Sequence, residues 1–100
     1  MPETNAKSFG QIQDDPASLA LAALGWILAD ADRATRMLAL TGLTPDILRT
    51  AISEAPTLAA ILAFLEAHEP DLVAAADHVG VSPKALVSAR MELEACAALC

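Results

Sequence analysis

The apolar residues of this chain recur at helical spacing in short stretches that begin at prolines. Proline lacks an N–H donor and holds φ at roughly −65°, which suits the first turn of a helix. Of the 6 prolines, all but Pro2 stand where a helix would begin. Asp15, Thr44 and Ser82 each precede a proline and carry side chains that cap helix N-termini. Helices are therefore predicted over residues 16–29, 31–41, 45–54, 56–67, 70–79 and 83–98.

The predicted helices differ in how their apolar residues are distributed. Over residues 56–67, Leu58, Ile61, Leu62 and Leu65 form a one-sided stripe, and residues 70–79 show the same spacing. Over residues 16–29 the large apolar side chains point around most of the circumference. A helix that is apolar on all sides is buried by its neighbours, so this first helix is expected to be central.

Two corners of the chain share one pattern: Gly, an aliphatic residue, Ser or Thr, Pro, two further residues, then Leu. It starts at Gly42 and again at Gly80. A left-handed glycine would end one helix, and a capped proline would begin the next. We therefore predict a compact all-α bundle of five to six short helices with helix-turn-helix-like corners.

Residues 1–14 lack apolar periodicity and are predicted to be a flexible N-terminal arm. Its large apolar residues Phe9 and Ile12 would dock the arm. Residues 15–100 are predicted to form a single helical domain, since 100 residues suffice for one domain at most. The run Leu19–Ala29 is too short to span a bilayer, and Asp14 and Asp15 precede it where a secretory signal carries positive charge. A cytoplasmic protein without a membrane segment is expected.

The amino-acid composition limits the classes of function that the protein can have. The chain is 55% hydrophobic, but 23 residues are Ala and only 3% are aromatic, which favours closely crossing helices over a thick core. The formal net charge is −7, so the protein is acidic and nucleic-acid binding is disfavoured. The 2 cysteines fit a reducing compartment better than a disulfide scaffold.

Little in the sequence supports catalysis or a bound cofactor. No phosphate-binding glycine loop and no recognisable nucleophile setting occur, so a non-enzyme without cofactors is expected. His68 and His78 lie in an acidic stretch but on either side of a helix break, which fits solvated helix ends better than a metal site. Three arginines, Arg33, Arg36 and Arg49, could form a small basic cluster. They are expected to pair with carboxylates nearby in the chain, namely Asp30, Asp32 or Asp46. The alternative is that they bind an acidic segment of a partner.

The C-terminal helix is the predicted interaction surface. Leu86, Leu93 and Cys100 are spaced seven apart, and Val87 and Met91 flank them. Cys96 and Cys100 continue this seam as small apolar side chains facing the bundle or a second subunit, with a redox or metal pair as the alternative.

The corner around Gly80 also resembles a DNA-reading helix-turn-helix. In that resemblance Ala76 lets the two helices approach, and the following helix enters the major groove. It would present Lys84, Ser88 and Arg90 to nucleic acid. An ordinary helix corner explains the same residues, because acidic side chains outnumber basic ones in this region.

Three stretches together resemble a small bacterial family of similar length, found mainly in alphaproteobacteria, whose function is uncharacterised. They are Leu19–Leu28, Leu38–Pro45, and Phe64-Leu65 followed by Val79–Pro83. The resemblance spans roughly residues 17–91 and implies an intracellular all-helical domain with no catalytic residues to carry over.

The sequence as a whole favours a non-catalytic module for protein–protein interaction or self-association, with a possible homodimer. A DNA-associated regulator using residues 70–95 is the alternative, and a helical subunit of a larger enzyme is a third reading.

Overall fold

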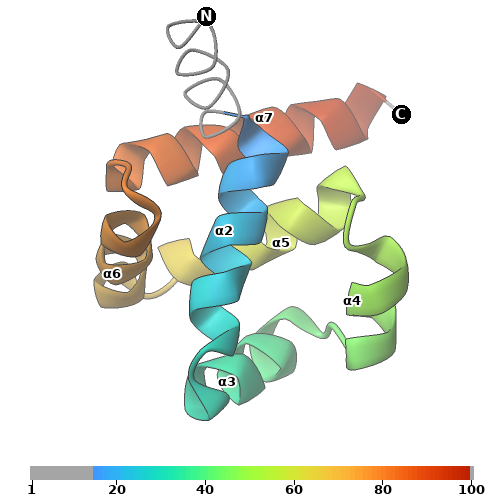
Figure 1. The fold of residues 1–100 in the computed structure, drawn as a ribbon. Coiled ribbons are helices and arrows are strands. Elements are labelled where there is room, and N and C mark those ends of the chain that lie inside the picture. Colours follow the sequence, from blue (N-terminus) through green and yellow to red (C-terminus); the bar gives the residue numbers. More distant parts are fainter. Residues whose placement is uncertain (1–14, 100) are drawn as a thin grey trace, which may run out of the picture.

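Six helices make up the described part of the chain, residues 15–99 of the computed structural model (Figure 1). No strand occurs among these residues, which confirms the all-α bundle. The arm predicted over residues 1–14, and Cys100, lie outside the described residues. The helices are α2 (Pro16–Leu28), α3 (Ala31–Thr41), α4 (Pro45–Ala51), α5 (Ala55–Glu66), α6 (Glu69–Val79) and α7 (Pro83–Leu99).

The helix boundaries follow the predicted caps. The three predicted capping side chains each accept a hydrogen bond from a backbone N–H three residues later, at 3.1 Å in every case. The pairs are Asp15 with Ser18, Thr44 with Ile47, and Ser82 with Ala85. These bonds satisfy N–H groups that have no partner inside the helix, so the local sequence defines where α2, α4 and α7 begin.

Glycine ends α3 and α6, as predicted. Gly42 has φ 78° and Gly80 has φ 91°, both in the left-handed region that side chains disfavour. Their N–H groups donate to Leu38 and Ala76 at 3.0 and 2.8 Å. Only α4 is clearly shorter than predicted: it ends at Ala51, because the chain must turn before Pro56 can take its place in the first turn of α5.

The core is organised around α5, which packs against α2, α3, α6 and α7. In Figure 1, α5 passes behind α2, and α7 runs across the upper end of α2. The prediction that residues 16–29 form the central helix is therefore wrong in part: α2 also contacts four helices, but it leaves Leu21 and Leu28 exposed. The buried residues of α5 are Thr57, Leu58, Ala59, Ile61, Leu62, Phe64 and Leu65.

Small residues allow the helices to approach closely. Ala20 and Ala23 of α2, Ala75 and Ala76 of α6, and Ala89 of α7 are almost completely buried. A buried Ala adds little apolar area, but it lets a neighbouring backbone come near. The high alanine content therefore serves helix crossings, as the composition predicted.

No helix within residues 15–99 has both the length and the apolar character that crossing a bilayer requires.

Replacing Leu86 by Ala should destabilise the protein by about 2–5 kcal/mol, because it removes buried methyl groups and leaves a cavity beneath α7. The same truncation at Met91, which is 58% exposed on the same helix, should change the free energy of unfolding by less than about 0.5 kcal/mol. Urea unfolding followed by circular dichroism measures both. Equal losses in the two variants would contradict the burial of Leu86.

Candidate interaction surface

The structure does not bring the predicted α7 surface together. Leu86 and Leu93 are buried in the core, so their seven-residue spacing marks the inward face of α7 and not a surface. Val87 is half-buried against the same core, Met91 is exposed, and Cys100 lies outside the described residues. The prediction of a free Leu86–Leu93 stripe is therefore wrong, because α5 and α2 already pack against α7.

Cys96 does not face the bundle interior, which was one of the two predicted positions. Its side chain is exposed, although it follows Leu86, Ala89 and Leu93 at seam spacing. It lines a hollow of about 510 Å³ between the start of α2, the start of α5 and the end of α7. The inward face of α7 is therefore buried at Leu86 and Leu93 but exposed near its C-terminal end, at Cys96.

The residues of the DNA-binding alternative are only partly available. Lys84 and Ser88 are exposed, whereas the Arg90 guanidinium donates hydrogen bonds to the carboxylates of Glu66 and Glu94. These hydrogen bonds, the one with Glu66 first, raise the pKa of Arg90 above its ordinary value. Arg90 therefore ties α7 to α5, and its charge is already neutralised by neighbours.

Every arginine among residues 15–99 is paired with a carboxylate. Arg33 pairs with Asp30 and Arg49 with Asp46, as predicted. Arg36 instead pairs with Asp71, 35 positions away in the chain, at 2.7 Å. Sequence spacing carried no signal for this contact, because only the fold brings α3 beside the start of α6. The three arginines therefore do not form a free basic cluster.

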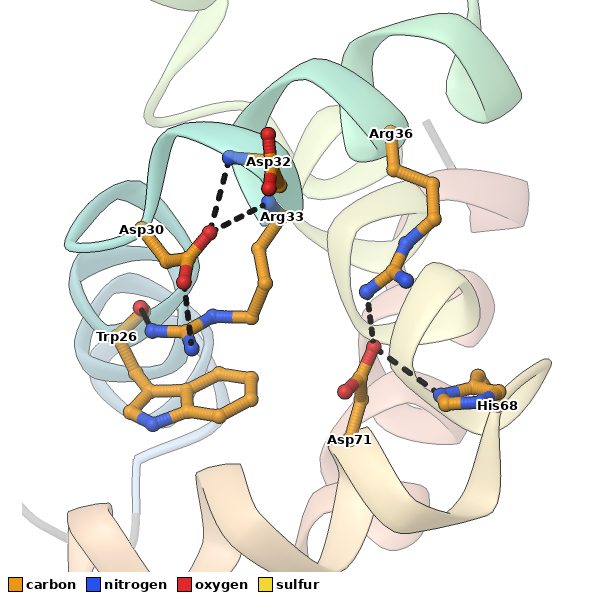
Figure 2. A network of polar contacts seen from close by, with 7 residues as sticks. All are labelled: Trp26, Asp30, Asp32, Arg33, Arg36, His68 and Asp71. Atoms are coloured by element: carbon orange, nitrogen blue, oxygen red, sulfur yellow. Dashed lines mark hydrogen bonds and ion pairs between the residues drawn. The ribbon is translucent and has the colours of Figure 1, made fainter.

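The junction of α2 and α3 is held by Trp26, Asp30 and Arg33 (Figure 2). The Arg33 guanidinium lies 3.7 Å from the centre of the Trp26 ring and donates to the Trp26 carbonyl oxygen at 2.6 Å. Asp30 caps α3, and the backbone N–H of Arg33 is the main cause that lowers the pKa of this carboxyl. Because a cation over an indole face is attracted by the ring quadrupole, the contact sets the angle at which α3 leaves α2.

A second polar group joins α3 to α6. The Asp71 carboxylate accepts a hydrogen bond from the Arg36 guanidinium, and His68 Nδ1 lies 3.2 Å from the same Asp71 oxygen (Figure 2). Arg33 and Arg36, one turn apart, thus point to different neighbours, and α3 is fastened to both α2 and α6. Within the described residues, no three His, Cys, Asp or Glu side chains lie close enough to hold a metal ion.

The most apolar exposed feature is a groove between α2 and α4, which we call the α2–α4 groove. Its volume is about 360 Å³. Leu28 is 49% exposed, and Leu21 lies two turns earlier on the same face of α2. Ile47 of α4 is also exposed, although it does not line the groove. The groove is lined by Leu24, Leu28, Leu48, Arg49 and Ile52.

This groove was missed by the sequence analysis. The signal was present in residues 16–29, whose large apolar side chains cover more of the circumference than the surrounding helices bury. The sequence alone did not show which of these side chains would stay uncovered, since α4 lies beside them only in the folded chain.

A third hollow, of about 380 Å³, lies between α3 and α5. It combines the exposed Leu40 with small side chains of α5, Ala60, Ala63 and Ala67, beside Phe64. Its floor is shallow alanine surface, whereas the α2–α4 groove is walled by large aliphatic side chains. The latter therefore offers a partner the larger aliphatic side chains and the less polar lining.

The fold and these features define a small all-α domain with apolar hollows between its helices. The family described as "Protein of unknown function (DUF3572)" matches residues 13–95, so the chain belongs to that family. Comparison with curated proteins and with solved structures gave no significant match.

Replacing Arg33 by Gln should lower the free energy of unfolding by about 1 kcal/mol, because the variant loses the contact with Trp26 and the pairing with Asp30. The matched variant Arg49→Gln removes an ion pair whose side chains are 72% and 85% exposed, so a change below about 0.5 kcal/mol is expected. Fluorescence of Trp26, the single tryptophan, monitors urea unfolding of both. A larger loss in Arg49→Gln would contradict the role assigned to Arg33.

Proposed function

We propose that this protein is a non-catalytic interaction module that binds an amphipathic helix of a partner protein in the α2–α4 groove. The observation that carries the proposal is a groove lined by aliphatic side chains in which Leu28 is 49% exposed. A hollow lined by leucine and isoleucine suits the apolar face of a helix, which anchors itself by side chains one turn apart.

The apolar groove is a source of binding energy. Leu21, Leu28 and Ile47 are three of the six large hydrophobic side chains that are exposed among the described residues. Covering one such side chain completely stabilises a complex by roughly 1.5–3 kcal/mol before the entropic costs of association. A helix that covers this cluster would therefore replace much of the exposed aliphatic surface by contacts.

The weak anchoring of α4 favours a helix as occupant. It is the only helix within residues 15–99 that contains no buried residue, and Leu48 and Ile52 hold it through half-buried contacts with the core. Segments with few buried contacts move at the lowest cost in free energy. A shift of α4 can therefore widen the groove without disturbing the packing of α5 against α7.

The net charge of the chain indicates which charged side chains the partner helix carries on its polar face. The chain carries a net charge of −7, and the four arginines within residues 15–99 are already paired. The remaining field attracts basic side chains and repels both nucleic acid and a second copy of the chain. We therefore propose a partner helix with Lys or Arg beside its apolar face, encountered in the cytoplasm, where the cysteines stay reduced.

The substitution Leu28→Glu should abolish partner binding, because it places a charge in the apolar groove while the exposed position leaves the fold intact. Val73→Glu is the matched control: Val73 is 48% exposed on α6 and receives the same charge. Tagged protein recovers partners from nuclease-treated native lysate, and a synthetic helix from the recovered protein is titrated by calorimetry. Binding to wild type and Val73→Glu, with at least about a tenfold loss for Leu28→Glu, is expected.

Three outcomes would contradict this proposal. Equal recovery by Leu28→Glu and wild type would show that the groove is not the binding surface. A dimer in light scattering that Leu28→Glu dissociates would assign the groove to a second copy of the chain. Retention on duplex DNA that falls with salt and with Lys84→Glu would favour the nucleic-acid alternative instead.

A further inference from the structure

We propose that α4 occupies part of the partner's site and that the partner helix displaces α4 from α2. This inference rests on the proposed function and gives α4 a regulatory role: in the free protein, this short helix competes with the partner and lowers its apparent affinity. Figure 1 shows α4 at the edge of the bundle, between the end of α3 and the start of α5. The packing of α5 against α2, α3, α6 and α7 does not involve it.

The polar contacts of α4 stay within the helix and its cap. Thr44 caps the first turn, and Arg49 pairs with Asp46. The Thr50 hydroxyl donates a hydrogen bond to the backbone carbonyl oxygen of Asp46 at 3.0 Å. Within residues 15–99, no side-chain hydrogen bond or ion pair joins α4 to another helix, whereas arginine pairs join α3 to α6 and α7 to α5. Displacing α4 therefore breaks no polar contact between helices.

Two aliphatic side chains attach α4 to the core. Leu48 and Ile52 are half-buried and lie four positions apart, which places them on one face at helical spacing. They line the α2–α4 groove opposite Leu24 and Leu28 of α2. An amphipathic partner helix presents the same pattern, with aliphatic side chains one turn apart. The partner and α4 therefore compete for the same apolar face of α2.

A partner helix can cover more of α2 than α4 covers. With α4 in place, Leu21 and Leu28 are still 43% and 49% exposed. They are seven positions apart, or about 10 Å along the helix axis, so a partner helix of three turns can cover both. A ligand shifts a conformational equilibrium only through its difference in affinity for the two states. The face of α2 that is freed by displacement, together with Leu21 and Leu28, provides this difference.

Short turns on both sides of α4 allow the movement. Residues 42–44 connect α4 to α3, and residues 52–54 connect it to α5. Gly42, at φ 78°, begins the first of these turns, and glycine has the widest choice of backbone conformations. Hinges consist of a few such residues that absorb changes in φ and ψ. The helix can therefore move away while α3 and α5 keep their positions.

The test compares affinities for the synthetic partner helix by calorimetry. Leu48→Ala/Ile52→Ala weakens the attachment of α4 and should lower the apparent Kd about tenfold, as expected if the displaced fraction rises from roughly 1% to roughly 10%. The control Ile47→Ala removes an exposed aliphatic side chain of the same helix that does not line the groove, so no such gain is expected. Circular dichroism confirms that the fold persists in each variant.

Amide hydrogen exchange measures the displacement in the absence of a partner. The amides of residues 48–51 should exchange about tenfold faster in Leu48→Ala/Ile52→Ala than in wild type, while the amides of α5 keep their rates. Equally slow exchange of α4 and α5 in the wild-type protein would overturn the inference, because α4 would then open only when the whole domain unfolds.

The sign of the affinity change separates displacement from a fixed groove wall. If Leu48 and Ile52 were contacts for the partner, their truncation would weaken binding. Weaker or unchanged binding by the double variant, with binding still abolished by Leu28→Glu, would overturn the displacement and leave the proposed function standing. Full binding by Leu28→Glu would overturn both.

Discussion

The packing of α7 and α2 against α5 is the constraint on which the rest of the structure depends. Of the 12 residues of α5, seven are buried, and four other helices lie against it. Leu86, Ala89 and Leu93 of α7 complete the same core. Because α5 is buried on most of its sides, it serves as the axis of the fold. Functional surfaces are left to the outer helices and to the ends of the crossings.

Polar contacts complete this arrangement by connecting elements that apolar packing alone leaves adjustable. Arg33 holds the α2–α3 junction through Trp26, Arg36 fastens α3 to α6 through Asp71, and Arg90 ties α7 to α5 through Glu66. All are partly exposed, so each contributes modestly to stability, but their directions are specific. Because the arginines are paired with carboxylates of the same chain, most of the charged side chains that remain unpaired are carboxylates. The acidic character of the chain is therefore stronger at the surface than the ratio of charged residues suggests.

Two apolar hollows remain because the helices of this chain differ in length and anchoring. Near the end of α2, the short α4 covers Leu24 but leaves Leu28 open, which forms the α2–α4 groove. Near the start of α2, the first residues of α5 and the end of α7 leave a second hollow, which exposes Cys96 above the buried Leu58 and Leu93. Both hollows are made from the same excess of aliphatic residues, and each faces a different end of α2. The groove proposed for a partner is therefore separate from the hollow lined by Cys96.

The sequence by itself determined the helices and their ends. Asp15-Pro16, Thr44-Pro45 and Ser82-Pro83 begin helices, and Gly42 and Gly80 end them, because caps and backbone preferences act within a few residues. Only the tertiary structure decided which apolar faces are covered. Periodicity shows that Leu86 and Leu93 share a face, but not that this face is turned inward while Leu28 and Cys96 remain exposed. Nor does it show that Arg36 meets Asp71 instead of a nearby carboxylate. Such contacts join residues far apart in the chain, and they exist only once the helices have taken their places around α5.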